Sequence, residues 1–246
     1  MFINCLKVEL YKYRRSPVLI AHLVIPVVVS LIFIAYYSVS PWSDKDKIVA
    51  FYQALGIAFP VLIGIFTASE VEKELGAGHF QNLLTYKSKV VALLSKVAVL
   101  LILGLSALML TTLIFGILFS NVLGMGGEAV AEYGHNAIVT YVIAAFVIWL
   151  AGIPFYFWTQ ILALSFGKGL AIGFGIFSAI LSGVFLTEIG SLVWRVVPIS
   201  WTGRMVNAYF EHDLMSVIFI YFVVTIVSVL CYAIFALRYE GNSASE

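Results

Sequence analysis

Six long apolar stretches, separated by shorter polar segments, account for most of the pattern of hydrophobic and polar positions along the chain. Each approaches or exceeds the ~20 residues that a helix needs to cross a hydrocarbon core about 30 Å thick. The pattern therefore predicts an all-α membrane protein with six transmembrane helices in one transmembrane domain, 1–246. The expected spans are 18–39, 48–68, 90–120, 137–165, 170–187 and 214–237.

Three of these stretches carry further features. The third is longer than a bilayer requires, so we expect its first turns to stand out of the membrane, with Lys96 extending to the lipid headgroups. The fourth is predicted to be interrupted at Gly152-Ile153-Pro154. The fifth contains small residues that permit close helix contacts or, alternatively, line a path at a subunit interface. These residues are Gly173, Gly175, Ser178, Ser182 and Gly183.

The N-terminal segment, 1–17, combines one apolar helical face with basic residues elsewhere. This pattern is typical of an amphipathic helix lying in the cytoplasmic membrane interface. A basic tail that only obeys the positive-inside rule is the alternative. The apolar residues are Phe2, Ile3, Leu6 and Leu10, and the basic ones are Lys7, Lys12, Arg14 and Arg15.

A polar segment, 69–89, lies between the second and third apolar stretches. Glu70 and Glu74 are four residues apart and would share one helical face, with Lys73 beside both, whereas Glu72 would point elsewhere. Gly76 and Gly78 then break the pattern ahead of a second apolar patch. A polar segment of this kind needs water or a partner, so a solvated loop and a contact site for another protein are both open.

Two further segments are expected on the outer side. The first, 121–136, is a glycine-rich polar loop. The second, 188–213, suits a broken pair of short helices re-entering the outer leaflet, because irregular backbone at that depth persists only when it packs on protein. An interfacial loop with an aromatic belt is the alternative. The residues assigned to this re-entrant segment are Trp194, Arg195, Pro198, Trp201 and Arg204.

Composition and charge agree with a membrane location and set an orientation. Hydrophobic residues make up 62% of the chain and charged residues 11%, too few to cover a soluble domain. If both termini are cytoplasmic, ten of the 14 Lys and Arg residues lie inside, which the positive-inside rule favours. A formal net charge of +1 gives no indication of a nucleic-acid partner.

The sequence contains none of the motifs of an energy-transducing enzyme. It lacks the phosphate-binding pattern GxxxxGKS/T, the zinc motif HExxH and the nucleophile motif GxSxG. The four histidines lie in different segments, so no metal site is expected. The predicted spans hold almost no ionisable residues, which argues against ion-coupled transport. If the protein transports a substrate, its energy should come from another polypeptide.

Three sequence runs resemble a known family. They are AYYSVSPW at 35–42, GAGHFQNLL at 76–84 and LLSK at 93–96. Together with the layout of the whole chain, they resemble an ABC type-2 permease, and more narrowly the MutG-like G subunits of the LanFEG lantibiotic-immunity transporters. The GHFQ patch is the most specific piece.

The resemblance implies a non-catalytic subunit in the cell membrane of a bacterium of Gram-positive type. Its partners would be a second permease subunit, giving a heterodimer, and two copies of an ATPase that carries ATP and Mg. The substrate would be a cationic amphipathic lantibiotic expelled from the membrane lipid. No cofactor or metal bound by this chain is implied, and no substrate-binding residue is assigned.

The same resemblance assigns a cytoplasmic coupling helix to 70–84, which would dock in a groove of the ATPase. The implied coupling residues are Glu70, Glu74, Gly76, Gly78, His79, Phe80, Leu83 and Leu84.

Two alternatives to lantibiotic export remain open. One is a related permease for another amphipathic drug, lipid or peptide, such as bacitracin. The other is a membrane immunity or sensor protein that binds its ligand without transport.

Overall fold

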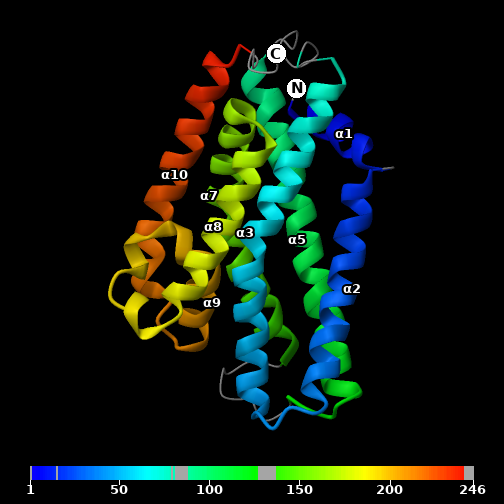
Figure 1. The fold of residues 1–246 in the computed structure, drawn as a ribbon, viewed down its shortest axis with the longest axis vertical. Coiled ribbons are helices and arrows are strands. Elements are labelled where there is room, and N and C mark those ends of the chain that lie inside the picture. Colours follow the sequence, from blue (N-terminus) through cyan, green and yellow to red (C-terminus); the bar gives the residue numbers. More distant parts are fainter. Residues whose placement is uncertain (1, 15, 79, 81–87, 127–136, 241–246) are drawn as a thin grey trace.

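The fold is known from a computed structural model that describes residues 2–14, 16–78, 80, 88–126 and 137–240. Within these ranges the protein consists of helices and connecting turns, with no β-strand (Figure 1). The α-helices are α1 (Phe2–Tyr13), α2 (Pro17–Tyr37), α3 (Asp44–Gly76), α5 (Lys89–Asn121), α7 (Ala137–Phe166), α8 (Lys168–Phe185), α9 (Trp201–Phe210) and α10 (Met215–Arg238).

Six of these helices, α2, α3, α5, α7, α8 and α10, are long and apolar enough to cross a membrane. The predicted all-α class and the six membrane-crossing stretches are thus confirmed. Most of the predicted outer loop at 121–136 lies outside the described residues. So do Arg15 of the N-terminal segment and three of the predicted coupling residues, His79, Leu83 and Leu84.

Serine residues set the beginnings of three long helices. The hydroxyl of Ser16 accepts a hydrogen bond from the Val18 amide, and Pro17 occupies the first helical position of α2. Ser43 and Ser88 cap α3 and α5 in the same way. These caps satisfy amide groups that have no partner inside the helix, so each polar-to-apolar boundary in the sequence becomes a helix start.

Helix α3 is longer than the predicted span, and one predicted interruption, in α7, is absent. Helix α3 continues beyond the predicted second span to Gly76, so the acidic residues of the polar segment lie on an extension of a long helix. Helix α7 runs unbroken through Gly152 and Pro154, contrary to the prediction. Gly152 instead makes room for Phe59 of α3, whose Cε1 atom would lie 2.5 Å from an added Cβ atom.

Helix α3 occupies a central position and packs against α7, α8 and α9, while α2 packs mainly on α5. Gly64 and Gly175 allow α3 and α8 to approach closely, since a Cβ atom at Gly175 would lie 2.6 Å from the Pro60 carbonyl oxygen. Gly173 and Gly183 face open space instead. Only part of the small-residue pattern in α8 therefore serves close packing.

The segment between α8 and α10 contains three single turns of 3-10 helix followed by α9. The turns span Glu188–Gly190, Trp194–Val196 and Pro198–Ser200. Helix α9 is almost wholly buried against α3, α7 and α8. Irregular backbone packed on protein was the expectation for this segment, although it comprises several short turns and one helix instead of two broken helices.

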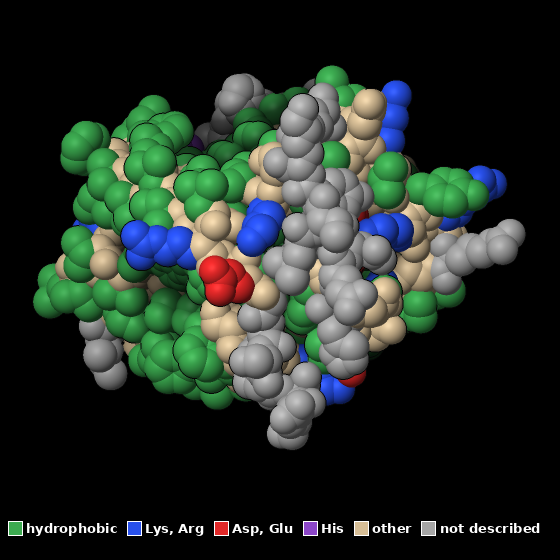
Figure 2. All heavy atoms as spheres, turned by 90° about the horizontal axis from the view of Figure 1, so that it is seen from above, with side chains coloured by type: hydrophobic (Ala, Val, Ile, Leu, Met, Phe, Trp, Pro, Cys, Tyr) green, Lys and Arg blue, Asp and Glu red, His purple; other side chains and the backbone are tan. Residues whose placement is uncertain are grey.

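Helix α1 and the last turn of α10 lie at the same end of the bundle, near the end of α3 (Figure 1). This shared end is called the terminal end below. Seen from this end, Lys, Arg, Asp and Glu side chains are visible on the face of the bundle, and hydrophobic side chains lie around them (Figure 2).

The contact between α3 and α9 generates a stability prediction. A Cβ atom at Gly56 would overlap the Thr202 carbonyl oxygen and lie 2.9 Å from the Gly203 Cα atom, and neither backbone atom can move cheaply. We expect Gly56→Ala to lower the free energy of unfolding by about 1–3 kcal/mol. Gly173→Ala is the matched control, because nothing lies within 4 Å of its added Cβ. Equal unfolding midpoints for the two variants in detergent would contradict the packing described.

Candidate functional site

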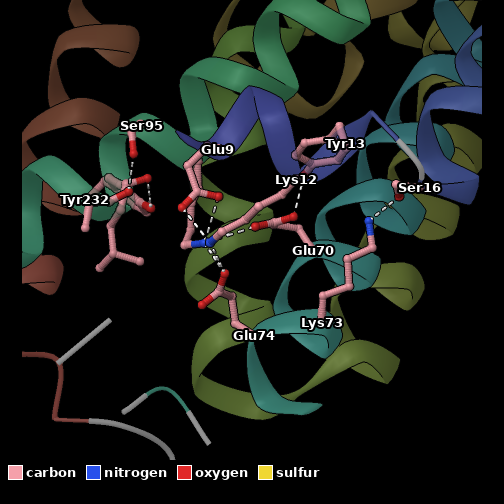
Figure 3. A network of polar contacts seen from close by, with 12 residues as sticks. Glu9, Lys12, Tyr13, Ser16, Glu70, Lys73, Glu74, Ser95 and Tyr232 are labelled. Atoms are coloured by element: carbon pink, nitrogen blue, oxygen red, sulfur yellow. Dashed lines mark hydrogen bonds and ion pairs between the residues drawn. The ribbon is translucent and has the colours of Figure 1, made fainter. Parts of the chain in front are cut away.

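The ammonium group of Lys96, near the start of α5, lies among the carboxylates of Glu9, Glu70 and Glu74. Figure 3 shows these three carboxylates pointing toward one another. The Nζ atom of Lys96 is 2.5 Å from Glu74, 3.1 Å from Glu70 and 3.2 Å from Glu9. The side chain is only 3% exposed. The prediction that Lys96 extends to the lipid headgroups is therefore wrong, because carboxylates from α1 and α3 supply the polar surroundings instead.

Lys12 of α1 completes this group. Its Nζ atom lies 2.9 Å from both Glu9 and Glu74, and its side chain is 46% exposed. The five residues Glu9, Lys12, Glu70, Glu74 and Lys96 are called the charge cluster below. It joins α1, the last turns of α3 and the first turns of α5.

The i,i+4 spacing on α3 correctly predicted which glutamates act together. Glu70 and Glu74 both reach Lys96, whereas Glu72 points to another face and pairs with Lys168 at 2.5 Å. The side chains of Glu72 and Lys168 are 56% and 62% exposed, so this second pair lies at the surface. Lys73 lies beside the cluster, with its Nζ atom 2.5 Å from the Ser16 hydroxyl.

Glu9 is the member of the cluster that sequence reasoning missed. It is the only acidic residue before Asp44, and it lies three residues before Lys12. One signal in the sequence could have identified Glu9. It is a single acidic residue in a basic helix, and its i,i+3 spacing to Lys12 allows an ion pair on one helical face. Its side chain is 4% exposed, which places it in the interior with Lys96.

The electrostatics of α1 follow from this arrangement. Partial burial opposes the charged form of Lys12, but hydrogen bonds to Glu9 and Glu74 outweigh it and raise the pKa of the ammonium above its ordinary value. Burial and the negative charge of Glu70 raise the pKa of the Tyr13 hydroxyl, which donates a hydrogen bond to Glu70. The contribution of Lys12 to stability is present below its ordinary pKa and is lost only as the pH rises through the raised pKa, well above neutrality.

Three carboxylates that converge on one point resemble the donor set for a hard cation. One oxygen atom from each of Glu9, Glu70 and Glu74 lies within 4.8 Å of the others. Here the Lys96 ammonium already lies between them and supplies the positive charge. The arrangement therefore acts as an internal ion-pair network that ties three helices together.

The expected coupling residues are distributed over different environments. Gly76 ends α3, and Gly78 has a φ of 124°, a conformation that favours glycine. Phe80 is only 3% exposed, and its ring packs perpendicular to that of Tyr239 at 5.9 Å between centroids. Phe80 was expected among the residues that dock on the ATPase. In the isolated chain it is instead covered by the residue that follows α10.

The segment between α8 and α10 has its own polar contacts. Arg195 donates hydrogen bonds to Asp213 at 2.5 Å and to the Ser216 hydroxyl at 2.9 Å, and its guanidinium lies over the Trp194 ring. These contacts hold the 3-10 turns against the start of α10.

Further along this segment, Pro198 begins the last 3-10 turn and Trp201, fully buried, begins α9. Arg204 donates to the carbonyl oxygens of Phe185 and Thr187 and thereby satisfies groups at the C-terminal end of α8. These contacts give the five predicted residues roles in packing and capping.

A largely apolar cavity of about 300 Å³ lies between α2, α3 and α5. His22 lines it, with its ring 4.1 Å from that of Phe66 and its Nδ1 atom 2.7 Å from the Val18 carbonyl oxygen. An engineered cavity of about half this size binds benzene, so the space can accept an apolar group.

The fold and these polar contacts define a helical membrane protein whose ionic network lies at one end of the bundle. Residues 5–177 match the family described as ABC-2 family transporter protein, so the chain belongs to that family. It is a multi-pass membrane transporter subunit. Membership of this family implies, in general terms, that the partner is an ABC ATPase. No curated protein matches the chain significantly.

The charge cluster generates a first prediction for this site. Lys96→Met would leave buried carboxylates without their main cation, and we expect a loss of about 3–5 kcal/mol in the free energy of unfolding. Lys168→Met removes a lysine from the exposed pair with Glu72 and should change stability by less than about 1 kcal/mol. Unfolding of both variants in detergent, followed by tryptophan fluorescence, measures the difference. A Lys96→Met protein as stable as the control would show that the network contributes nothing.

Tyr13 generates a second prediction. Tyr13→Phe keeps the packing of the ring but removes the hydroxyl that donates to Glu70, and we expect a loss of about 1.5–3 kcal/mol because the acceptor is charged. Tyr11→Phe on the same helix is the control, since Tyr11 is 72% exposed. The same unfolding measurement applies, and a comparable loss in the control would rule out the hydrogen bond as the cause.

Proposed function

We propose that this permease subunit exports a cationic amphipathic peptide of the lantibiotic class, driven by ATP hydrolysed on a separate ATPase. In this proposal segment 69–89 receives the movement of the ATPase, and the charge cluster passes it to the transmembrane helices. The observation that carries the proposal is the convergence of Glu9, Glu70 and Glu74 on Lys96, on both sides of the connection between α3 and α5.

The charge cluster makes the terminal end of the bundle stiff. Removing one partner of a buried ion pair costs about 3–5 kcal/mol, so thermal motion rarely separates the members of this network. A displacement of the connection would therefore move α1, α3 and α5 together. A loop joined to the bundle only by its own flexible backbone would absorb the same displacement.

The cluster changes the roles proposed for individual coupling residues. Glu70 is buried and the side chain of Glu74 is only 11% exposed. We therefore assign both residues to the network that transmits force, and not to the surface that touches the ATPase. Gly76 and Gly78 lie nearer the surface of the terminal end and remain candidates for that contact. Phe80 would reach a partner only after leaving Tyr239.

The proposed assembly contains two ATPase copies, which bind ATP and Mg, and a second permease subunit. This chain itself has no catalytic role and binds no cofactor or metal in the proposal. The terminal end faces the cytoplasm of a Gram-positive bacterium, with both termini inside. The location of α1 and the end of α10 at one end of the bundle supports a shared side for the termini (Figure 1).

The substrate class rests on the sequence runs at 35–42, 76–84 and 93–96 that resemble lantibiotic-immunity permeases. The test is to express the chain with its partner permease and ATPase in a sensitive bacterium and to measure growth inhibition by nisin and bacitracin. We expect a several-fold rise in resistance to nisin that disappears when the phosphate-binding lysine of the ATPase is replaced by alanine. Resistance to bacitracin alone would favour a permease for another amphipathic compound. Resistance that persists without ATP hydrolysis would favour an immunity protein that binds its ligand without transport.

The coupling role has its own test in the same cells. Glu74→Gln keeps the size of the side chain but removes its charge, so we expect several-fold less transport for each ATP hydrolysed while the ATPase still copurifies. Glu72→Gln, on the exposed face of the same helix turn, is the matched control and should leave this ratio unchanged. Full resistance in Glu74→Gln cells that hold the intact complex would overturn the role of the cluster.

A further inference from the structure

Helix α1 has two chemically different sides. Glu9, Lys12 and Tyr13 face the bundle and enter the ionic and hydrogen-bonded network. Lys7 and Leu10 lie on another face together with Tyr11 and Arg14, at positions i, i+3, i+4 and i+7. The proposed transport function uses only the first of these sides.

The second side borders a hollow of about 430 Å³ between α1, α2 and α5. Leu10, Leu19 and Leu103 give it an apolar wall, while Lys7 and Arg14 bring two positive charges to it. A site with a hydrocarbon wall and cations matches a molecule that is anionic at one end and apolar at the other.

The two cations differ from the lysines of the charge cluster. Lys12 and Lys96 are each bound to carboxylates, whereas neither Lys7 nor Arg14 has an ion-pair partner within the part of the chain that the structure describes. Both side chains are exposed and available to an external anion.

Neighbouring side chains indicate where this anion comes from. Ile3 is 65% exposed and Tyr11 is 72% exposed on α1, and Ile20 is 61% exposed on the first turn of α2. Large apolar side chains beside unpaired cations are characteristic of a helix at the boundary between headgroups and hydrocarbon. A soluble anion would leave the apolar wall in contact with water, but a lipid covers it.

We propose that this hollow binds an anionic phospholipid of the cytoplasmic leaflet. The phosphate lies between Lys7 and Arg14, and the upper part of an acyl chain packs on Leu10, Leu19 and Leu103. The assignment to that leaflet rests on the proposed orientation. The bound lipid steadies α1 and thereby the position of Glu9 beside Lys96.

The experiment uses the full chain, copurified with its partners in neutral detergent, and titrates it with phosphatidylglycerol while native mass spectrometry counts bound lipid. For Lys7→Gln with Arg14→Gln we expect binding about thirtyfold weaker, because a basic residue contributes about 1 kcal/mol toward an anionic lipid surface and 1.4 kcal/mol corresponds to tenfold. Lys7→Arg with Arg14→Lys keeps both charges and should retain binding within a few-fold.

Two controls separate this site from general charge effects. Lys168→Gln with Arg238→Gln removes the same net charge from exposed positions and should leave binding unchanged. Glycerol 3-phosphate, the soluble headgroup analogue, should compete poorly because it cannot cover the apolar wall. Equal binding by the Lys7/Arg14 glutamine variant and the wild type, equal losses in the two glutamine variants, or full competition by glycerol 3-phosphate would each overturn the proposal.

The measurement requires neither nucleotide nor peptide, so it is independent of the transport test. Lipid binding that persists in a protein without nisin resistance would refute only the proposed function. Resistance in a protein whose lipid binding does not depend on Lys7 and Arg14 would refute only the lipid site.

Discussion

The ammonium of Lys96 is a full positive charge in the protein interior, and the arrangement of the terminal end depends on its neutralisation. An isolated charge there would cost several kcal/mol, and only partners from other helices can offset this cost. Those partners come from α1 and α3, so the position of Lys96 determines where the N-terminal helix lies and how far α3 extends as a helix. In the remainder of the bundle, apolar contacts and small residues that permit close approach predominate, with single hydrogen bonds between helices such as that from Tyr232 to the Leu93 carbonyl oxygen. None of these contacts involves α1 as the ion pairs do, so they would tolerate other placements of it.

Different kinds of contact predominate in two regions of the protein. At the terminal end a few directional ionic contacts join three helices around one connection. In the segment between α8 and α10, buried aromatic residues and carbonyl groups capped by Arg204 hold irregular backbone in place. The coupling role proposed for the terminal end requires a region that moves as a unit, and its directional ionic contacts suit that requirement.

The features that the sequence predicts well are those that depend on neighbours along the chain. Apolar length identified the six membrane-crossing helices, and the i,i+4 spacing identified the shared face of Glu70 and Glu74. The features it predicts poorly depend on distant residues. Lys96 was assigned to lipid headgroups because its partners Glu9 and Glu70 lie 87 and 26 positions away. Gly152 was interpreted as a break because the ring of Phe59, for which it makes room, comes from another helix.

The contact between Phe80 and Tyr239 has a consequence for the order in which the protein is made. Lys89 also donates a hydrogen bond to the Tyr239 carbonyl oxygen at 3.0 Å, so the residue after α10 holds both sides of the connection between α3 and α5. Because α10 follows the other described helices along the chain, the ribosome must release Tyr239 before these contacts form. The contacts of Phe80 and Lys89 with Tyr239 therefore form later in synthesis than the ion pairs of the charge cluster, whose members all lie before α7.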